Sequence, residues 1–126
     1  MADEKIMTVV TDYRREQLCK ITSGMITTIP KITHIAFGSG GVNNVPVRAQ
    51  IALNKEEGRY EIDSVSYPAP TTARYTVMIP EDDLDGVSIS EAALVDENGE
   101  LCAIRNMLPK GKDSGMAFVF TFDDEF

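Results

Sequence analysis

Ser39 and His34 are the residues of this sequence that come nearest to a catalytic nucleophile and its base. Ser39 lies between two glycines, and His34 is the only histidine. The Gly-x-Ser-x-Gly spacing of a nucleophile elbow is absent. The two residues are five positions apart on a segment expected to be extended, so we expect their side chains to lie far apart. The sequence therefore predicts no hydrolase site and, more generally, no enzyme.

The glycine-rich run Gly38-Ser39-Gly40-Gly41 could cradle a phosphate or form a tight turn. A P-loop ends in Gly-Lys-Ser/Thr, and a dinucleotide loop needs a third spaced glycine and a following helix. Residues 42–46 supply neither feature. We therefore predict that residues 38–44 form an exposed, mobile loop that is available as an interface with a partner, and we predict no cofactor.

Two runs of carboxylates superficially resemble cation sites. Residues 96–100 begin like an EF-hand loop, but the glycine comes fourth instead of sixth, and position twelve is Met107 instead of glutamate. Residues 81–85 fit either a weak surface cation site or a solvated acidic turn. One histidine and two distant cysteines cannot build a zinc site by themselves. The prediction is that the chain holds no metal.

Glu91 is the one acid at an otherwise apolar set of alternating positions between residues 87 and 95. Two interpretations remain open. Glu91 is either partly buried and paired, for instance with an arginine, or it marks a strand end that reaches solvent.

Composition limits the protein to a few classes. The chain has 126 residues, which suits one domain over residues 1–126, and a net charge of −8. Nucleic-acid binders need a basic stripe, which is missing here. Cys19 and Cys102 fit no ligand or redox spacing, so we expect free thiols. Residues 1–5 are polar and no apolar run follows them, which predicts synthesis in a cytosol without a signal peptide. No run is long enough to insert in a membrane.

The elements that would position these residues are mostly strands. Thr11 is a good N-cap, and apolar residues then recur at helical spacing, which predicts one helix over residues 11–22. Strands are expected over residues 32–37 and 73–79. Residues 42–50 are expected to be a loop, and residues 49–56 either a short helix or more loop. A phase slip at residues 63–64 predicts a bulge or bend within one strand over residues 60–67.

A hairpin is expected over residues 92–105, because Asn98-Gly99 suits a type I′ turn. With no alternation of strands and helices, these elements predict an α+β, mostly β fold: an antiparallel β-sandwich-like domain with one N-terminal helix.

The C-terminal segment, residues 115–122, is apolar at nearly every position. One face fits the core, and the other, with Ala117 and Val119, also needs cover. The alternative is a central strand covered on both faces within one monomer. Ala117, Val119 and Phe122 are therefore interface candidates, together with Gly38–Gly41. The acidic residues 123–125 favour a basic partner surface.

Several stretches, read together, resemble the N-terminal domain of bacteriophage tail-fibre or tail-collar fibre proteins. They are Ser23-Gly24, Ile32-Thr33-His34-Ile35-Ala36-Phe37-Gly38-Ser39-Gly40-Gly41, Pro46, residues 52–56 (ALNKE), Ile79-Pro80, residues 89–96 (ISEAALVD), residues 98–103 (NGELCA) and residues 109–113 (PKGKD). The pieces follow the family's order over nearly the whole chain. Ala92-Ala93 and Val95 depart from it, where a glycine-containing pair and an aromatic residue are common.

The resemblance implies a structural protein of a phage or prophage tail that attaches a fibre to the baseplate and has no catalytic residues. It implies phage tail or baseplate proteins as partners, a homo-oligomer, commonly a trimer, and a place in the virion tail after synthesis in the bacterial cytoplasm. Family members usually continue into a shaft and a receptor-binding tip, so a short fibre or an adaptor is expected here. A free-standing carbohydrate- or ligand-binding β-domain is the alternative, although the sequence has no tryptophan.

Overall fold

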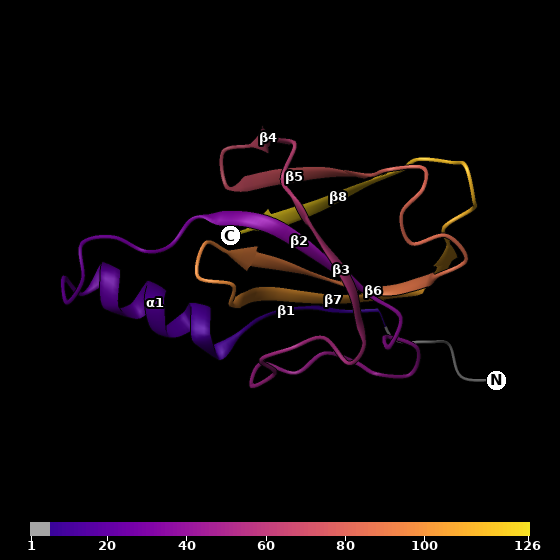
Figure 1. Cartoon of the computed structure of the whole chain (residues 1–126). Coiled ribbons are helices and arrows are strands. Elements are labelled where there is room, and N and C mark those ends of the chain that lie inside the picture. The colour runs from indigo at the N-terminus through magenta and orange to yellow at the C-terminus, as the bar shows by residue number, and fades with distance from the viewer. Residues whose placement is uncertain (1–5) are drawn as a thin grey trace.

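Two antiparallel sheets pack face to face, and one helix extends away from them (Figure 1). The computed structural model describes residues 6–126; residues 1–5, on which the expectation of no signal peptide rests, lie outside the described residues. The larger sheet has the strand order β1-β7-β6-β2-β3, and the smaller sheet has the order β4-β5-β8. The predicted α+β, mostly β, sandwich-like fold with one N-terminal helix is confirmed.

The elements follow the chain in the order β1(Thr8–Val10), α1(Asp12–Thr22), β2(Ile32–Gly38), β3(Glu56–Glu61), β4(Ser64–Ala69), β5(Thr72–Ile79), β6(Ser88–Asp96), β7(Leu101–Gly111) and β8(Phe118–Glu125). The helix and the strands expected near residues 32 and 73 are therefore present with nearly the expected bounds. Residues 39–55 contain no helix or strand, so the loop alternative is correct for residues 49–55.

The main core lies between the two sheets, because alternate strand residues are apolar and point to one side. Phe37 of the large sheet meets Phe120 of the small sheet edge-to-face, with ring centroids 5.2 Å apart. Val77 and Ile79 of β5 are fully buried beside them. These contacts hold the smaller sheet over the larger one.

A second apolar cluster lies on the opposite face of the large sheet. Its strand residues include Ala36, Ala93 and Ile104, and Leu53 from the segment 39–55 packs on them. This segment therefore covers the outer face of the large sheet.

The predicted bend within one strand near residues 63–64 is wrong. Residues 56–61 form β3 in the large sheet, whereas residues 64–69 form β4 in the small sheet. The apolar residues change from one set of alternating positions to the other where the chain crosses from the large sheet to the small sheet. Each strand therefore has its own alternation of apolar and polar residues.

The hairpin formed by β6 and β7 is confirmed, but its turn is not type I′. The amide of Gly99 donates to the carbonyl of Asp96 at 2.9 Å, which places Glu97 and Asn98 at the centre of the turn. In the described chain only Asn43 and Leu84 are non-glycine residues with positive φ, so Asn98 is not. Gly99 has a φ of 82° and follows the turn, as in a three-residue hairpin loop with a glycine bulge.

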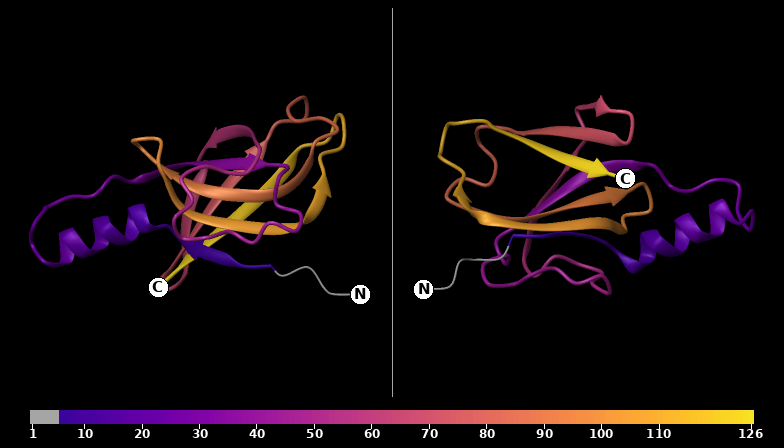
Figure 2. Two further views of the ribbon diagram at one scale, coloured as in Figure 1. Left: turned by 90° about the horizontal axis from the view of Figure 1, so that it is seen from below. Right: turned by 180° about the vertical axis from the view of Figure 1, so that it is seen from behind.

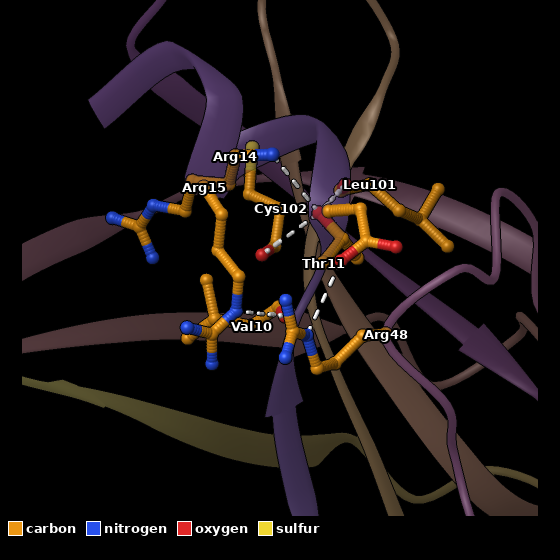
Figure 3. Close-up of polar contacts among 8 residues, drawn as sticks. Val10, Thr11, Arg14, Arg15, Arg48, Leu101 and Cys102 are labelled. Carbon is orange, nitrogen blue, oxygen red and sulfur yellow. Dashed lines mark hydrogen bonds and ion pairs between the residues drawn. The ribbon is translucent and has the colours of Figure 1, made fainter. Parts of the chain in front are cut away.

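Helix α1 is fixed to the sandwich at its N-terminal end (Figure 3). The side chain of Thr11 caps the amide of Arg14 and donates to the carbonyl of Leu101 on β7 at 2.7 Å. Tyr13 donates to the carboxylate of Asp96 at 2.6 Å. The rest of the helix projects beyond the sheets, which both views in Figure 2 show.

Candidate interaction surface

Glu91 is buried, and its carboxylate binds backbone amides instead of an arginine. It accepts from the amide of Gly40 at 2.8 Å and from the amides of Asn54 and Lys55, each at 2.9 Å. Only 1% of the residue is exposed. The interpretation of Glu91 as a solvent-reaching strand end is therefore wrong. The carboxylate joins both ends of the segment 39–55 to strand β6.

The predicted exposed loop over residues 38–44 is exposed only at residues 42–44, and the prediction is wrong for Gly38–Gly41. Gly38 and Gly41 are buried, and Ser39 and Gly40 are only partly accessible. A Cβ atom added to Gly41 would lie 1.9 Å from the carbonyl oxygen of Ser90, and one added to Gly38 would lie 2.5 Å from the Glu91 carboxylate. The glycines are needed for this close approach between the loop and strand β6.

The exposed part of the same segment lies further along the chain. Four aliphatic side chains point to solvent there: Val42, Val45, Val47 and Ile51. Their backbone is held by the Glu91 contacts and by the amide of Gly41, which donates to the Ser90 hydroxyl at 2.9 Å. The segment is thus an anchored cover with an apolar outer surface.

Ser39 and His34 do not form a nucleophile-base pair. The Ser39 hydroxyl donates to the Glu57 carboxylate at 2.5 Å, and Nδ1 of His34 is 2.8 Å from the hydroxyl of Thr33. Each side chain is engaged by a local neighbour.

The acidic residues 81–85 contact a cation supplied by the chain itself. The ammonium group of Lys112, a residue that is 2% exposed, donates to the carbonyl of Glu81 at 2.9 Å and to the carboxylate of Asp85 at 3.0 Å. Within residues 6–126, no three His, Cys, Asp or Glu side chains are grouped so that they could hold a metal ion. The acidic turn is a structural contact that closes the end of the sandwich.

The two cysteines are free and differ in their surroundings. Cys19 is exposed on α1, and Cys102 is buried on β7. Burial raises the pKa of the Cys102 thiol to about 12, with a further contribution from the charge of Asp96. A thiol with this pKa stays protonated and unreactive near neutral pH.

The outer face of the small sheet is open and partly apolar. Val119 on β8 is 65% exposed, and its neighbour across the strands, Met78 on β5, is 51% exposed. Ala117 is exposed directly before β8. Two of the expected interface residues, Ala117 and Val119, therefore lie on an accessible face.

Phe122 does not share this face. It is 1% exposed and packs in the core beside Phe120, because residues of its parity point toward the large sheet. Its side chain is therefore absent from the outer face of the small sheet.

The acidic C-terminal residues are largely neutralised within the chain. Arg14 of α1 makes two hydrogen bonds to the buried carboxylate of Asp124, at 2.8 and 2.7 Å. Arg74 of β5 makes a similar pair with Asp123. The expectation that residues 123–125 present a free acidic surface is thus wrong for these two residues, and only Glu125 remains exposed.

A cleft of about 400 Å³ runs beside β8, between the two sheets. We call it the β8 cleft; it is lined by Thr8, Val10, Ala103, Arg105 and residues 122–125. Thr8 pairs with Arg105 and Val10 pairs with Ala103 across strands β1 and β7, so these four residues share one face. This part of the large sheet extends past the edge of the small sheet.

Sequence reasoning missed both Arg105 and the Arg14–Asp124 pair. Asp124 lies on the same side of β8 as the buried residues Phe120 and Phe122. An acid at such a position indicates a buried carboxylate that needs a partner, and this signal was present in the sequence. No signal in the sequence indicates which arginine, 110 positions away, meets it.

No helix among residues 6–126 is long and apolar enough to cross a membrane.

Comparison with known proteins gives one match. The family model described as phage tail-collar fibre protein, N-terminal, matches residues 1–117. Searches of curated proteins and of solved structures gave no match. The family is a structural component of phage tails, which agrees with the resemblance in the sequence. This chain belongs to the phage tail-collar fibre protein family, and its residues 1–117 match the family's N-terminal region.

Proposed function

We propose that this chain is a non-catalytic attachment module of a phage or prophage tail, folded as one domain over residues 1–126, that joins a fibre to the baseplate. The observation that carries the proposal is the open side of the small sheet. There, Val119 and Met78 form an exposed apolar pair on a sheet with no covering layer. Exposed apolar patches on small domains usually mark protein contacts.

The contacts of the polar residues support a role without catalysis. The Ser39 hydroxyl donates a hydrogen bond to the Glu57 carboxylate, and the ammonium of Lys112 binds Asp85 in the acidic turn. Broad substrate screening on metal-supplemented protein tests this part. Turnover that is abolished by Ser39→Ala or His34→Ala would contradict it.

The proposed partners are other tail or baseplate proteins, and neither nucleic acid nor a membrane is among them. Ala117, Val119 and Met78 belong to the proposed contact surface. Gly38 and Gly41 do not, because they are buried, and Phe122 contributes only where it lines the cleft beside β8.

Self-association into a trimer is part of the same proposal. Light scattering of the full chain at micromolar concentration should give three times the mass of one chain. A monomer at all concentrations would remove this part of the proposal.

Immunoelectron microscopy tests the location. Particles are produced from the genome that encodes this chain, and antibodies against the purified protein should label the tail. A matched genome with the coding sequence deleted should give unlabelled tails that lack fibres. Unlabelled wild-type particles, or deleted particles with normal fibres, would contradict the proposal.

A further inference from the structure

The β8 cleft leaves room for one more strand beside β8. The large sheet has five strands and the small sheet has three. Beyond β8, the inward face of β1 and the adjoining part of β7 has no strand of the small sheet above it, and the β8 cleft is the space left there. An extended segment placed beside β8 would continue the small sheet and cover this face.

The four sheet edges of the described chain differ in how well they resist such pairing. Strand β1 has only three residues, and β3 has four charged side chains among its six residues. Strand β4 contains Pro68 and has an irregular register between Ser66 and Ala69. Short length, charge, proline and bulges are the features that keep strand edges from pairing with other chains.

Strand β8 lacks these features over most of its length. It pairs with β5 through eight consecutive residues without a register shift, and its first five residues carry no charge and no proline. Among the described strands, β8 therefore has the edge that is best suited to accept another strand.

Charge in the cleft indicates the chemistry of that strand. Three acids line the cleft: Asp123 and Asp124 already bind Arg74 and Arg14, and Glu125 is exposed. Arg105 is half-buried at the floor of the cleft. Its side chain makes no hydrogen bond or ion pair to a residue in the range 6–126, and its charge acts at longer range on Asp123, where it helps to lower the pKa of that carboxyl. A carboxylate that entered the cleft would meet this guanidinium, and Arg105 is within reach of an inward-facing side chain of an added strand.

We propose that β8 accepts an extended segment of another tail protein by strand addition, with an Asp or Glu of that segment bound to Arg105 and apolar residues beside Val119. This inference rests on the proposed function, because it names the partner of the same surface. Main-chain hydrogen bonds would supply most of the affinity, and the acid would supply selectivity. A second copy of β8 fits less well, because the one acid on its inward-facing parity, Asp124, is already bound to Arg14.

A synthetic peptide tests the proposal on the full chain. The probe is the eight-residue peptide Thr-Val-Thr-Val-Glu-Val-Thr-Val, whose glutamate and valines lie on opposite faces of a strand. It is titrated against ¹⁵N-labelled protein and followed by amide shifts and amide exchange. We expect changes at residues 118–125 and 8–10. Replacing the glutamate by glutamine should weaken binding about tenfold, because the charge-assisted bond is lost. N-methylation of every peptide amide should abolish binding, since the main-chain donors are removed.

A protein variant locates the charge effect. In Arg105→Gln the glutamate and glutamine peptides should bind equally, whereas Arg59→Gln, which changes an arginine on β3 outside the cleft, should keep the tenfold difference. No binding of the glutamate peptide, shifts confined to residues 42–51, or an unchanged preference in Arg105→Gln would overturn the inference. Labelling of the tail by antibodies is independent of these outcomes, so failure of strand addition is distinguishable from failure of the tail assignment.

Discussion

The outer faces of the two sheets differ in whether another segment of the chain covers them. The large sheet is covered by residues 39–55, which the buried carboxylate of Glu91 holds through three backbone amides. The small sheet has no such cover: Met78 and Val119 are exposed, and the edge of β8 opens onto a cleft. The cover itself exposes Val42, Val45, Val47 and Ile51, but only the small sheet leaves its own strands open. For this reason the proposed partner contact is placed on the small sheet.

The sharpest test of this difference uses two neighbouring residues of β8. Phe120→Ala should lower the free energy of unfolding by about 4 kcal/mol, because it empties a site against Phe37 in the core. Val119→Ala should lower it by less than about 0.5 kcal/mol, because Val119 lies on the open face. Urea denaturation of both variants measures the two effects. A large loss in Val119→Ala would mean that this face is covered in the free protein.

The connection of β8 to the helix gives the next largest effect. Arg14→Met should cost about 3 kcal/mol, because the Asp124 carboxylate would stay buried without its partner. The double variant Arg14→Met/Asp124→Leu should recover much of that loss, since both charges are removed together. Thermal melts of the single and double variants form the cycle, with Arg15→Met on the exposed side of α1 as the control. Additive losses would show that the two side chains do not interact.

The cover of the large sheet is tested by Glu91→Gln. The amide keeps the shape but has only one acceptor oxygen, so the loss in stability should be about 2 kcal/mol, and amides in residues 39–55 should exchange faster. Glu61→Gln, an exposed acid on β3, is the matched control and should change neither. Unchanged exchange in the 39–55 segment of Glu91→Gln would mean that the carboxylate does not anchor the cover.

Lowering the pH should have the smallest effect on stability. It acts on the ion pair between Arg74 and Asp123 on the outer face of the small sheet. The hydrogen bonds and charge of Arg74 lower the pKa of Asp123 below its usual 3.8. A lowered pKa in the folded state stabilises the protein above the usual value, and this contribution disappears as the pH falls through the folded value. The stability difference between wild type and Asp123→Asn should therefore shrink toward zero as the solution is acidified below pH 3.8. In an Arg74→Met background the same comparison should lose this dependence on pH, because the side chain that lowers the pKa of Asp123 is gone.

Local patterns in the sequence predicted most of the fold. The Thr11 cap, the alternation in residues 73–79 and the turn residues near Gly99 are local signals, and each produced the expected element. The predicted turn type is wrong because Asn98-Gly99 suits two hairpin geometries. The choice between them depends on Asp96, whose carboxylate accepts hydrogen bonds from the amides of Asn98 and Glu100.

The interface residues were harder to predict, because exposure depends on contacts between distant segments. Gly38 and Gly41 belong to a glycine-rich run that is typical of exposed loops, yet Ser90 and Glu91, about fifty positions away, pack against them. Phe122 and Val119 were both apolar candidates, and only the sandwich decides which parity faces inward. The β8 cleft could not be inferred either, because it depends on the unequal widths of the two sheets.

Amide hydrogen exchange of the protein, free and in isolated tail particles, tests the central claim most directly. The account predicts that assembly slows exchange at residues 116–125 and 8–10 and leaves residues 39–55 unchanged. Slower exchange confined to residues 39–55, with the edge of β8 as accessible as in the free chain, would contradict it.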